Sequence, residues 1–245
     1  MTVADDELLL LAEQIAYYRE RAHEYDNWWD RVAQYELPEE LMVRWREEVA
    51  AVESWIASMA PLGRVVELAA GTGIMTRRLA APGVSTSVVA VDASPEVLAL
   101  NAARELGPHV RYVEHDVFTW AGDGDGRGEG GFDTVFFSFW LSHVPPARVE
   151  EFWSLVGRLL RPGGRAVFLD NVWGDTLRRQ DGVRPSTHVE TRTDLSSGST
   201  YRVVKVYYEP EELASLLAGL GWDAEVFGTG SFFLGGVARP RLLGR

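Results

Sequence analysis

The stretch that decides the fold is residues 65–73, with the sequence Val-Val-Glu-Leu-Ala-Ala-Gly-Thr-Gly. Its apolar, β-branched start is typical of a buried strand, and the small residues after Leu68 are typical of a tight turn. From Ile74 to Ala81 the pattern is helical, and Pro82-Gly83 ends it. A buried strand that runs through such a turn into a helix predicts an open α/β sheet, in which ligands bind at the carboxyl ends of the strands.

Outward from this stretch, short apolar runs alternate with helical patterns. We expect strands at 65–68, 87–91, 110–113, 132–139 and 165–169, and helices at 94–106 and 149–160. This alternation predicts a parallel sheet that is buried on both faces. Later residues predict a strand at 201–208, a helix at 210–220 and glycine-broken strand material at 222–237. The fold class is therefore α/β, a doubly wound sheet of seven strands, mostly parallel, with an antiparallel C-terminal hairpin.

The first 60 residues predict a helical cap that belongs to the same domain as residues 61–245. Apolar residues from Leu8 to Trp29 recur at steps of three and four, which places them on one helical face, and Pro38 opens a second helix that ends before Pro61. The first face is crowded with aromatic residues that carry polar tips, among them Tyr17, Tyr18, Tyr25 and Trp28. A simple packing seam would not need so many polar tips, so a lid is an alternative to plain packing.

Composition narrows the classes of function. The net charge of −12, from 36 acidic and 24 basic residues, would repel a long phosphate backbone, so nucleic acid is not an expected partner. The absence of cysteine excludes a disulfide framework and a thiolate nucleophile. No apolar run approaches the roughly 20 residues that span a bilayer, and the N-terminus lacks a basic start. We expect a cytoplasmic protein that does not enter membranes.

Two acidic residues follow neighbouring predicted strands. Asp92 ends the second strand, at a distance of about 20 residues from the glycine turn, where a carboxylate can accept both hydroxyls of a ribose. Asp116 follows the third strand, and the apolar residues Val117 and Phe118 come directly after it. An acceptor beside apolar side chains suits the edge of an adenine ring.

Together these residues resemble the class I S-adenosylmethionine-dependent methyltransferases over about residues 60–240. The resemblance implies a Rossmann-like domain with S-adenosylmethionine as cofactor, whose methionine end lies on the turn at 67–73. It also implies that the N-terminal helix covers the cofactor and helps to form the acceptor pocket, as in some small-molecule members. Alanine stands at position 69, where a common form of the motif has glycine, so we expect a narrower turn. The cofactor-binding residues that the resemblance implies are Tyr18, Arg21, Trp28, Glu67, Ala69, Gly71, Gly73, Thr76, Asp92, Ala93, Asp116, Val117, Phe118 and Phe139.

The implied chemistry is an in-line displacement at a sulfonium methyl group. A hydroxyl acceptor must also lose its proton, which requires a general base near the carboxyl ends of the fourth and fifth strands. His143 is the first candidate for a catalytic residue and Asp170 the second. His143 has an equal alternative role, which is to hold a loop by hydrogen bonds. His188 is expected on the surface of the polar connection 174–200, which could fold over the site. No metal ligand set is predicted.

Three functions remain open. The first is methyl transfer to a small-molecule acceptor, at a hydroxyl oxygen. The second is N-methylation of a small amine in an acidic pocket, and the third is a non-catalytic nucleotide-binding module. A nicotinamide enzyme is rejected, because the G-x-G-x-x-G spacing fails at the first turn, where Ala69, Gly71 and Ile74 occupy the three glycine positions.

Overall fold

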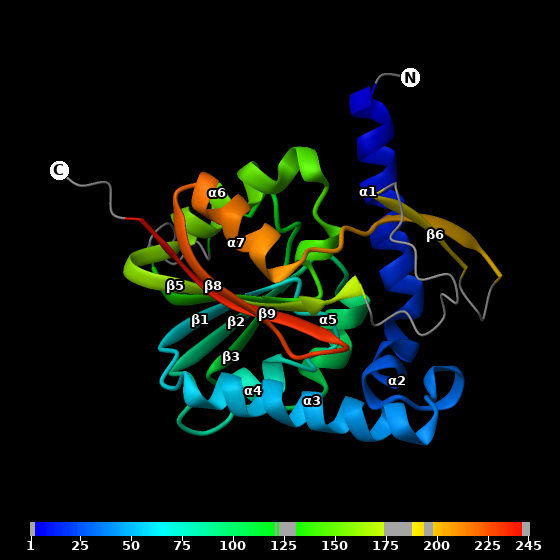
Figure 1. Cartoon of the computed structure of the whole chain (residues 1–245), viewed down its shortest axis with the longest axis horizontal. Coiled ribbons are helices and arrows are strands. Elements are labelled where there is room, and N and C mark those ends of the chain that lie inside the picture. Colours follow the sequence, from blue (N-terminus) through cyan, green and yellow to red (C-terminus); the bar gives the residue numbers. More distant parts are fainter. Residues whose placement is uncertain (1–2, 121, 123–130, 174–187, 194–197, 242–245) are drawn as a thin grey trace.

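A seven-stranded sheet forms the centre of the computed structural model, which describes residues 3–120, 122, 131–173, 188–193 and 198–241 (Figure 1). The strands are β1 (Arg64–Leu68), β2 (Ser87–Asp92), β3 (Val110–Glu114), β4 (Phe132–Ser138), β5 (Leu160–Asn171), β8 (Trp222–Gly228) and β9 (Phe233–Pro240). Their order is β3-β2-β1-β4-β5-β9-β8. The first five are parallel, and β9 runs antiparallel to both β5 and β8, which confirms the predicted sheet and its late hairpin.

Helices cover both faces of this sheet (Figure 1). They are α3 (Glu39–Ser58), α4 (Thr76–Leu79), α5 (Pro95–Ala102), α6 (Val149–Leu159) and α7 (Pro210–Gly219). The helices α6 and α7 lie on one face, and α3 and α4 on the other. Side chains of β1 alternate between the two cores: Val66 packs with the α6 face and Val65 with the α3 face. Both faces of the sheet are therefore buried under helices, as expected for parallel strands.

Three elements differ from the sequence prediction. The helix expected at 74–81 shrinks to α4, because residues 71–75 still belong to the turn. The strand β5 begins at Leu160, and the glycine turn before Arg165 is a bulge, since Leu160 pairs with Phe132 and Arg165 with Thr134. The strand at Thr200–Val204, β7, does not join the main sheet but pairs with β6 (Val189–Thr193), which was not predicted. The sequence of β6, Val-Glu-Thr-Arg-Thr, lacks the alternation of apolar and polar side chains that would mark it as a strand.

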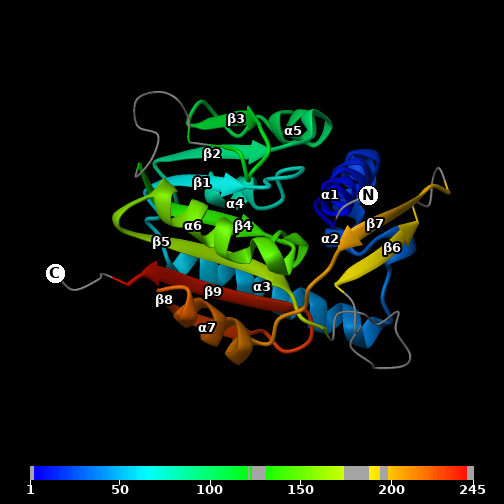
Figure 2. The ribbon, with the colours of Figure 1, turned by 90° about the horizontal axis from the view of Figure 1, so that it is seen from above.

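The N-terminal segment stands across the carboxyl ends of the parallel strands, beside β6 and β7 (Figure 2). It comprises α1 (Val3–Glu20), η1 (Arg21–Glu24), α2 (Tyr25–Asp30) and η2 (Ala33–Tyr35). The contact of α1 with β7 is long-range and both apolar and polar: Leu10 packs with Val204, the Val204 amide donates to Gln14 Oε1 at 2.9 Å, and Arg202 binds Glu13 and Asp6. The cap and the small sheet therefore form one wall around the site.

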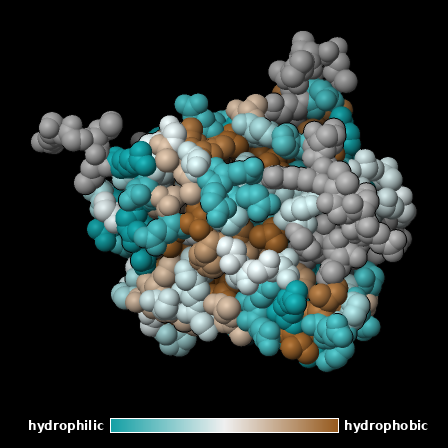
Figure 3. Space-filling model, in the orientation of Figure 1, coloured by the Kyte–Doolittle hydropathy of each residue, from teal (hydrophilic) through white to brown (hydrophobic). Residues whose placement is uncertain are grey.

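Hydrophilic and hydrophobic side chains are interspersed over the face in Figure 3. In the described part of the chain, every helix is too short or too polar to cross a bilayer. The glycine-rich loop expected at 122–131 lies for the most part outside the described residues, as does most of the connection 174–200.

Candidate active site

The turn after β1 is held in an unusual backbone conformation. Ala69 has φ +53°, and Gly71 and Gly73 have φ +57° and +92°. The left-handed region costs an alanine more than a glycine, which accounts for the glycine that commonly stands at position 69 in the family the sequence resembles. The Gly71 amide donates to Asp92 Oδ2 and the Ser94 amide to Asp92 Oδ1, both at 2.9 Å. The carboxylate of Asp92 thus joins the ends of β1 and β2.

A second layer of polar residues supports this turn from below. Thr76 Oγ1 donates to Glu67 Oε2 at 2.6 Å, and Asn101 Nδ2 donates to Thr76 Oγ1 at 2.8 Å and to the Gly71 carbonyl at 3.3 Å. A Cβ on Gly73 would collide with the Asn101 side chain. Burial raises the pKa of Glu67 to about 8. These residues shape the turn and do not face the space above it.

A small cavity of about 110 Å³ lies over the turn. Its walls include eight of the predicted cofactor residues: Tyr18, Ala69, Gly71, Asp92, Ala93, Asp116, Val117 and Phe139. A carboxylate offers about four lone-pair sites, and the backbone amides of Gly71, Ser94 and Ala93 donate to the carboxylate of Asp92. The remaining lone-pair capacity suits a hydroxyl of a diol at the cavity wall. Burial raises the pKa of Asp92, against the lowering effect of the amides that donate to it.

Hydrogen bonds and an ion pair hold the N-terminal cap against the turn after β1. Thr72 Oγ1 donates to Asp26 Oδ1 at 2.6 Å, and Arg104 Nη2 pairs with Asp26 Oδ2 at 2.5 Å. Arg104 Nε also donates to the Thr72 carbonyl at 2.6 Å. The start of α2 therefore closes over the cavity, and the cavity is small because the cap rests on it.

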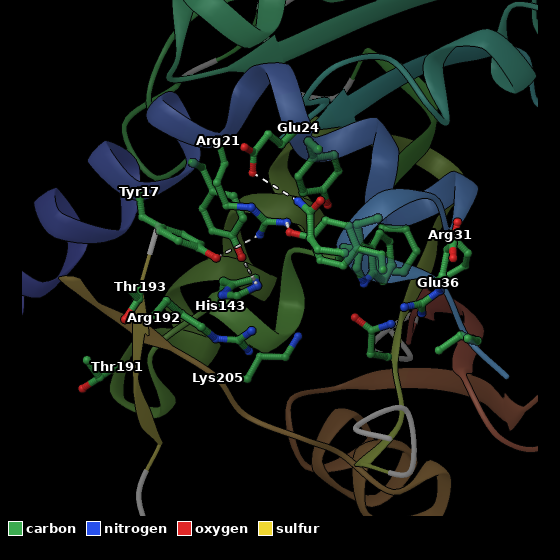
Figure 4. Close-up of a pocket in the computed structure, with 18 of the residues that line it drawn as sticks. Tyr17, Arg21, Glu24, Arg31, Glu36, His143, Thr191, Arg192, Thr193 and Lys205 are labelled. Atoms are coloured by element: carbon green, nitrogen blue, oxygen red, sulfur yellow. Dashed lines mark hydrogen bonds between the residues drawn. The ribbon is translucent and has the colours of Figure 1, made fainter. Parts of the chain in front are cut away.

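A larger cavity of about 470 Å³ opens beside the first, between the cap and the small sheet (Figure 4). Its volume lies within the range of roughly 300–1,000 Å³ that is typical of small-molecule sites. Among the described residues, its walls carry four basic side chains, Arg21, Arg31, Arg192 and Lys205, and two carboxylates, Glu24 and Glu36. The excess of two positive charges is opposite in sign to the net charge of the chain.

Four residues line both cavities: Tyr18, Tyr25, Phe139 and His143. Phe139 has φ +53°, which turns the chain out of β4 toward η3 (Leu141–His143). Strained backbone of this kind is common at functional sites. The two cavities therefore meet beyond the carboxyl end of β4, between that strand and the cap.

His143 is fixed on both ring nitrogens. Its Nδ1 lies 2.6 Å from the Val204 carbonyl and its Nε2 lies 2.8 Å from the Tyr18 hydroxyl. Because a carbonyl only accepts, Nδ1 carries the hydrogen, and Nε2 accepts from Tyr18. Burial, together with the positive charges of Lys205 and Arg192, holds the pKa of His143 well below 6.5. The imidazole is therefore neutral at pH 7, and its acceptor nitrogen is already engaged.

Asp170 lies behind the cavities and lines neither of them. Its Oδ2 accepts from the Ser142 amide and its Oδ1 from the Asn171 amide, both at 2.8 Å. Lys205 Nζ lies 3.8 Å from Oδ1 and donates to Ser142 Oγ at 2.8 Å. Asp170 is 3% exposed, so its contacts position η3 and Lys205.

The predicted site residues fall into three groups. Eight predicted cofactor residues and His143 line the small cavity. Arg21 and Trp28 line the large one, which Tyr18, Phe139 and His143 also border. Glu67, Gly73, Thr76, Phe118 and Asp170 line neither. Sequence reasoning missed Arg31, Arg192 and Lys205. The one available signal was that Lys205 is the only lysine of the chain. His188 is exposed and lies outside both cavities.

Comparison with known proteins identifies relatives over nearly the whole chain. Residues 65–164 match the family model described as a methyltransferase domain. The complex of DhpI with SAH is 32% identical, with a TM-score of 0.74, and the match covers 95% of this chain and 98% of that one. The DhpI-SAM-HEP complex is 35% identical, with a TM-score of 0.73 and the same coverage.

Two curated relatives match a shorter region. An uncharacterised methyltransferase of Synechocystis is 34% identical over 113 residues, which are 46% of this chain and 49% of that protein. The demethylmenaquinone methyltransferase of Clavibacter sepedonicus is 36% identical over 110 residues, which are 44% of this chain and 40% of that protein. The chain thus spans half or less of the length of these curated relatives.

Proposed function

Because the chain belongs to the class I S-adenosylmethionine-dependent methyltransferases, we propose that it transfers a methyl group from S-adenosylmethionine to an oxygen of a small-molecule acceptor. The observation that carries the proposal is the meeting of two cavities at four shared residues. One cavity is lined by eight of the fourteen predicted cofactor residues, and the other has the volume of a substrate pocket. A methyl group that passes between two ligands needs such a junction.

The residues of the small cavity fit the cofactor. The lone pairs of Asp92 that the backbone amides leave free would accept from the ribose hydroxyls, and Asp116 with Val117 would take the adenine side. The left-handed backbone at Ala69 and Gly71 would bring main-chain atoms close to the methionine end. When bound, S-adenosylmethionine supplies an activated methyl group on a sulfonium, so the protein has to align the acceptor and exclude water.

The side chains at the junction are suited to that work. Tyr18, Tyr25 and Phe139 present ring faces and edges that exclude water from the shared space. The hydrogen bond from Tyr18 to His143 ties the cap to η3, so both walls of the junction keep a fixed distance. His143 then orients the junction, and proton removal by its occupied Nε2 is not required by the proposal.

The charge of the larger cavity favours oxygen over nitrogen. A small amine is protonated at neutral pH, and four basic side chains would repel it. The same cavity argues against a non-catalytic module, because an open space of about 470 Å³ is available for a second ligand.

Calorimetry with S-adenosylmethionine and S-adenosylhomocysteine tests the cofactor assignment, with NAD as the control ligand. We expect both sulfur compounds to bind at one site per chain and NAD not to bind. The second step supplies methyl-labelled cofactor with pooled small acids, alcohols and amines, and identifies the labelled product. No binding of either sulfur compound would refute the proposal, and a labelled N-methyl product would replace oxygen by nitrogen.

A further inference from the structure

Three basic side chains surround His143 at the junction. Figure 4 shows Arg192 and Lys205 on one side of the imidazole and Arg21 on the other. All three lower the pKa of His143 through their charge, so each lies close enough to act on the same point. They come from three separate parts of the chain, namely η1, β6 and the segment after β7. The convergence of three positive charges on one buried space calls for an explanation.

Among these three basic side chains, Arg21 gives the strongest indication of a bound anion. It is only 9% exposed, and its guanidinium donates to the hydroxyls of Tyr17 at 3.0 Å and Tyr35 at 2.7 Å. Within the residues that the structure describes, no carboxylate pairs with it. A buried charge without a counter-charge is costly. An anion in the cavity would offset that cost.

Arg192 and Lys205 have carboxylate partners that stand outside the cavity. Arg192 pairs with Glu190 at 2.5 Å, and Lys205 faces Asp170 at 3.8 Å. Neither Glu190 nor Asp170 belongs to the cavity walls, whereas both cations do. The carboxylates therefore hold the two cations in place from behind. This arrangement resembles a built anion site more than a set of closed ion pairs.

We propose that the acceptor is a small oxyacid anion, with a carboxylate or phosphate group that Arg21, Arg192 and Lys205 bind beside His143. This inference rests on the proposed function, since it names the substrate class of the same site. Guanidinium and ammonium groups are the donors that bind carboxylate and phosphate most strongly. The position of the anion is the junction itself, where its oxygen would lie next to the cofactor cavity.

An oxyanion also fits the absence of an available base at His143. A lone pair of the ionised oxygen forms the new oxygen–methyl bond, the methyl–sulfur bond breaks, and its electron pair goes to sulfur. No proton has to be removed, so the engaged Nε2 of His143 is no obstacle. The charges balance as well, because one negative charge on the acceptor and the positive charge on sulfur disappear together.

The test is calorimetry on the full chain saturated with S-adenosylhomocysteine, at constant ionic strength. The probes are inorganic phosphate, acetate and methylammonium. We expect phosphate or acetate to bind at one site and methylammonium not to bind, and the stronger of the two anions distinguishes a phosphate from a carboxylate acceptor. Loss of one charge-assisted contact weakens binding by about 10- to 100-fold, so Arg192→Gln should show that loss for the anion that binds.

Two further variants serve as controls for this result. Arg192→Lys keeps the charge and should retain most of the affinity, and Arg46→Gln removes an exposed arginine outside both cavities and should change nothing. Affinity for S-adenosylhomocysteine, measured first on every sample, reports that each variant is folded. If the cofactor product binds but neither anion does, or if Arg192→Gln binds the anion as well as the wild type, the oxyanion site is refuted and the methyltransferase stands. If the wild type does not bind S-adenosylhomocysteine, the proposed function itself fails.

Discussion

Replacement of Asp92 by alanine tests the proposed cofactor site at the carboxylate that joins the ends of β1 and β2. The backbone amides of Gly71, Ser94 and Ala93 donate to the carboxylate, and its remaining lone pairs are assigned to the ribose hydroxyls. Hydrogen bonds to a charged group contribute about 1.5–3 kcal/mol each. Since water partly replaces the lost pair, we expect a net loss of about 2–4 kcal/mol, or roughly 30- to 1,000-fold in affinity for S-adenosylhomocysteine.

Calorimetry with S-adenosylhomocysteine measures this loss, and two other variants serve as comparisons. Asp92→Asn keeps the shape of the side chain, but its NH₂ group would face the backbone N–H of either Gly71 or Ser94. Its affinity for S-adenosylhomocysteine should therefore lie between those of the wild type and Asp92→Ala. Glu114→Gln removes the exposed carboxylate directly opposite Asp92 on β3 and should have no effect. Unchanged affinity in Asp92→Ala, with the protein still folded by thermal melting, would show that Asp92 does not hold the ribose.

Two further predictions follow from the contacts that hold the cap and from the layer below the turn. Asp26→Asn weakens the contacts with Thr72 and Arg104, so S-adenosylhomocysteine should dissociate about three- to tenfold faster in stopped-flow measurements of tryptophan fluorescence; an unchanged rate would mean that α2 only packs. Burial raises the pKa of Glu67 from 4.5 to about 8, so the unfolded chain binds fewer protons between these values and this residue lowers stability as pH rises through that window. In urea unfolding, the free energy of unfolding of Glu67→Gln should rise relative to that of the wild type by on the order of 3–5 kcal/mol between pH 5 and pH 9. Equal pH dependence of the two proteins would contradict the raised pKa of Glu67.

The cofactor half of the site was predictable because its determinants are local. The strand, turn and helix at 65–79 are contiguous, and Asp92 and Asp116 each follow a recognisable strand. Parallel strands bring their carboxyl ends to one edge, so position along the chain translates into position at the site. The sequence predicted a narrower turn at Ala69, and the structure adds that this residue has a left-handed backbone conformation. The support of the turn by Asn101 could not, because nothing in the local pattern marks it.

The acceptor half was not predictable for the opposite reason. Arg192 lies on a strand whose polar sequence gives no period-2 signal, and its partner strand lies in a second sheet. The cations of the larger cavity come from segments nearly 190 residues apart, at Arg21 and Lys205. The periodicity of each segment says where its apolar side packs, but not which polar side chains of different segments share a cavity. The positive charge of the pocket was further hidden by the acidic composition of the whole chain.

His143 shows which features of the site can be inferred from the sequence and which require the structure. Its position beyond β4 follows from topology, and in the structure it lines both cavities. Its protonation follows from partners that topology does not reveal: the Val204 carbonyl fixes the hydrogen on Nδ1, and the Tyr18 hydroxyl from the cap occupies Nε2. A histidine held in this way binds the cap to the sheet edge, and it serves as a base only after Tyr18 leaves. The choice between a hydroxyl acceptor and an ionised oxygen therefore turns on this one hydrogen bond, because only the hydroxyl acceptor requires that bond to break.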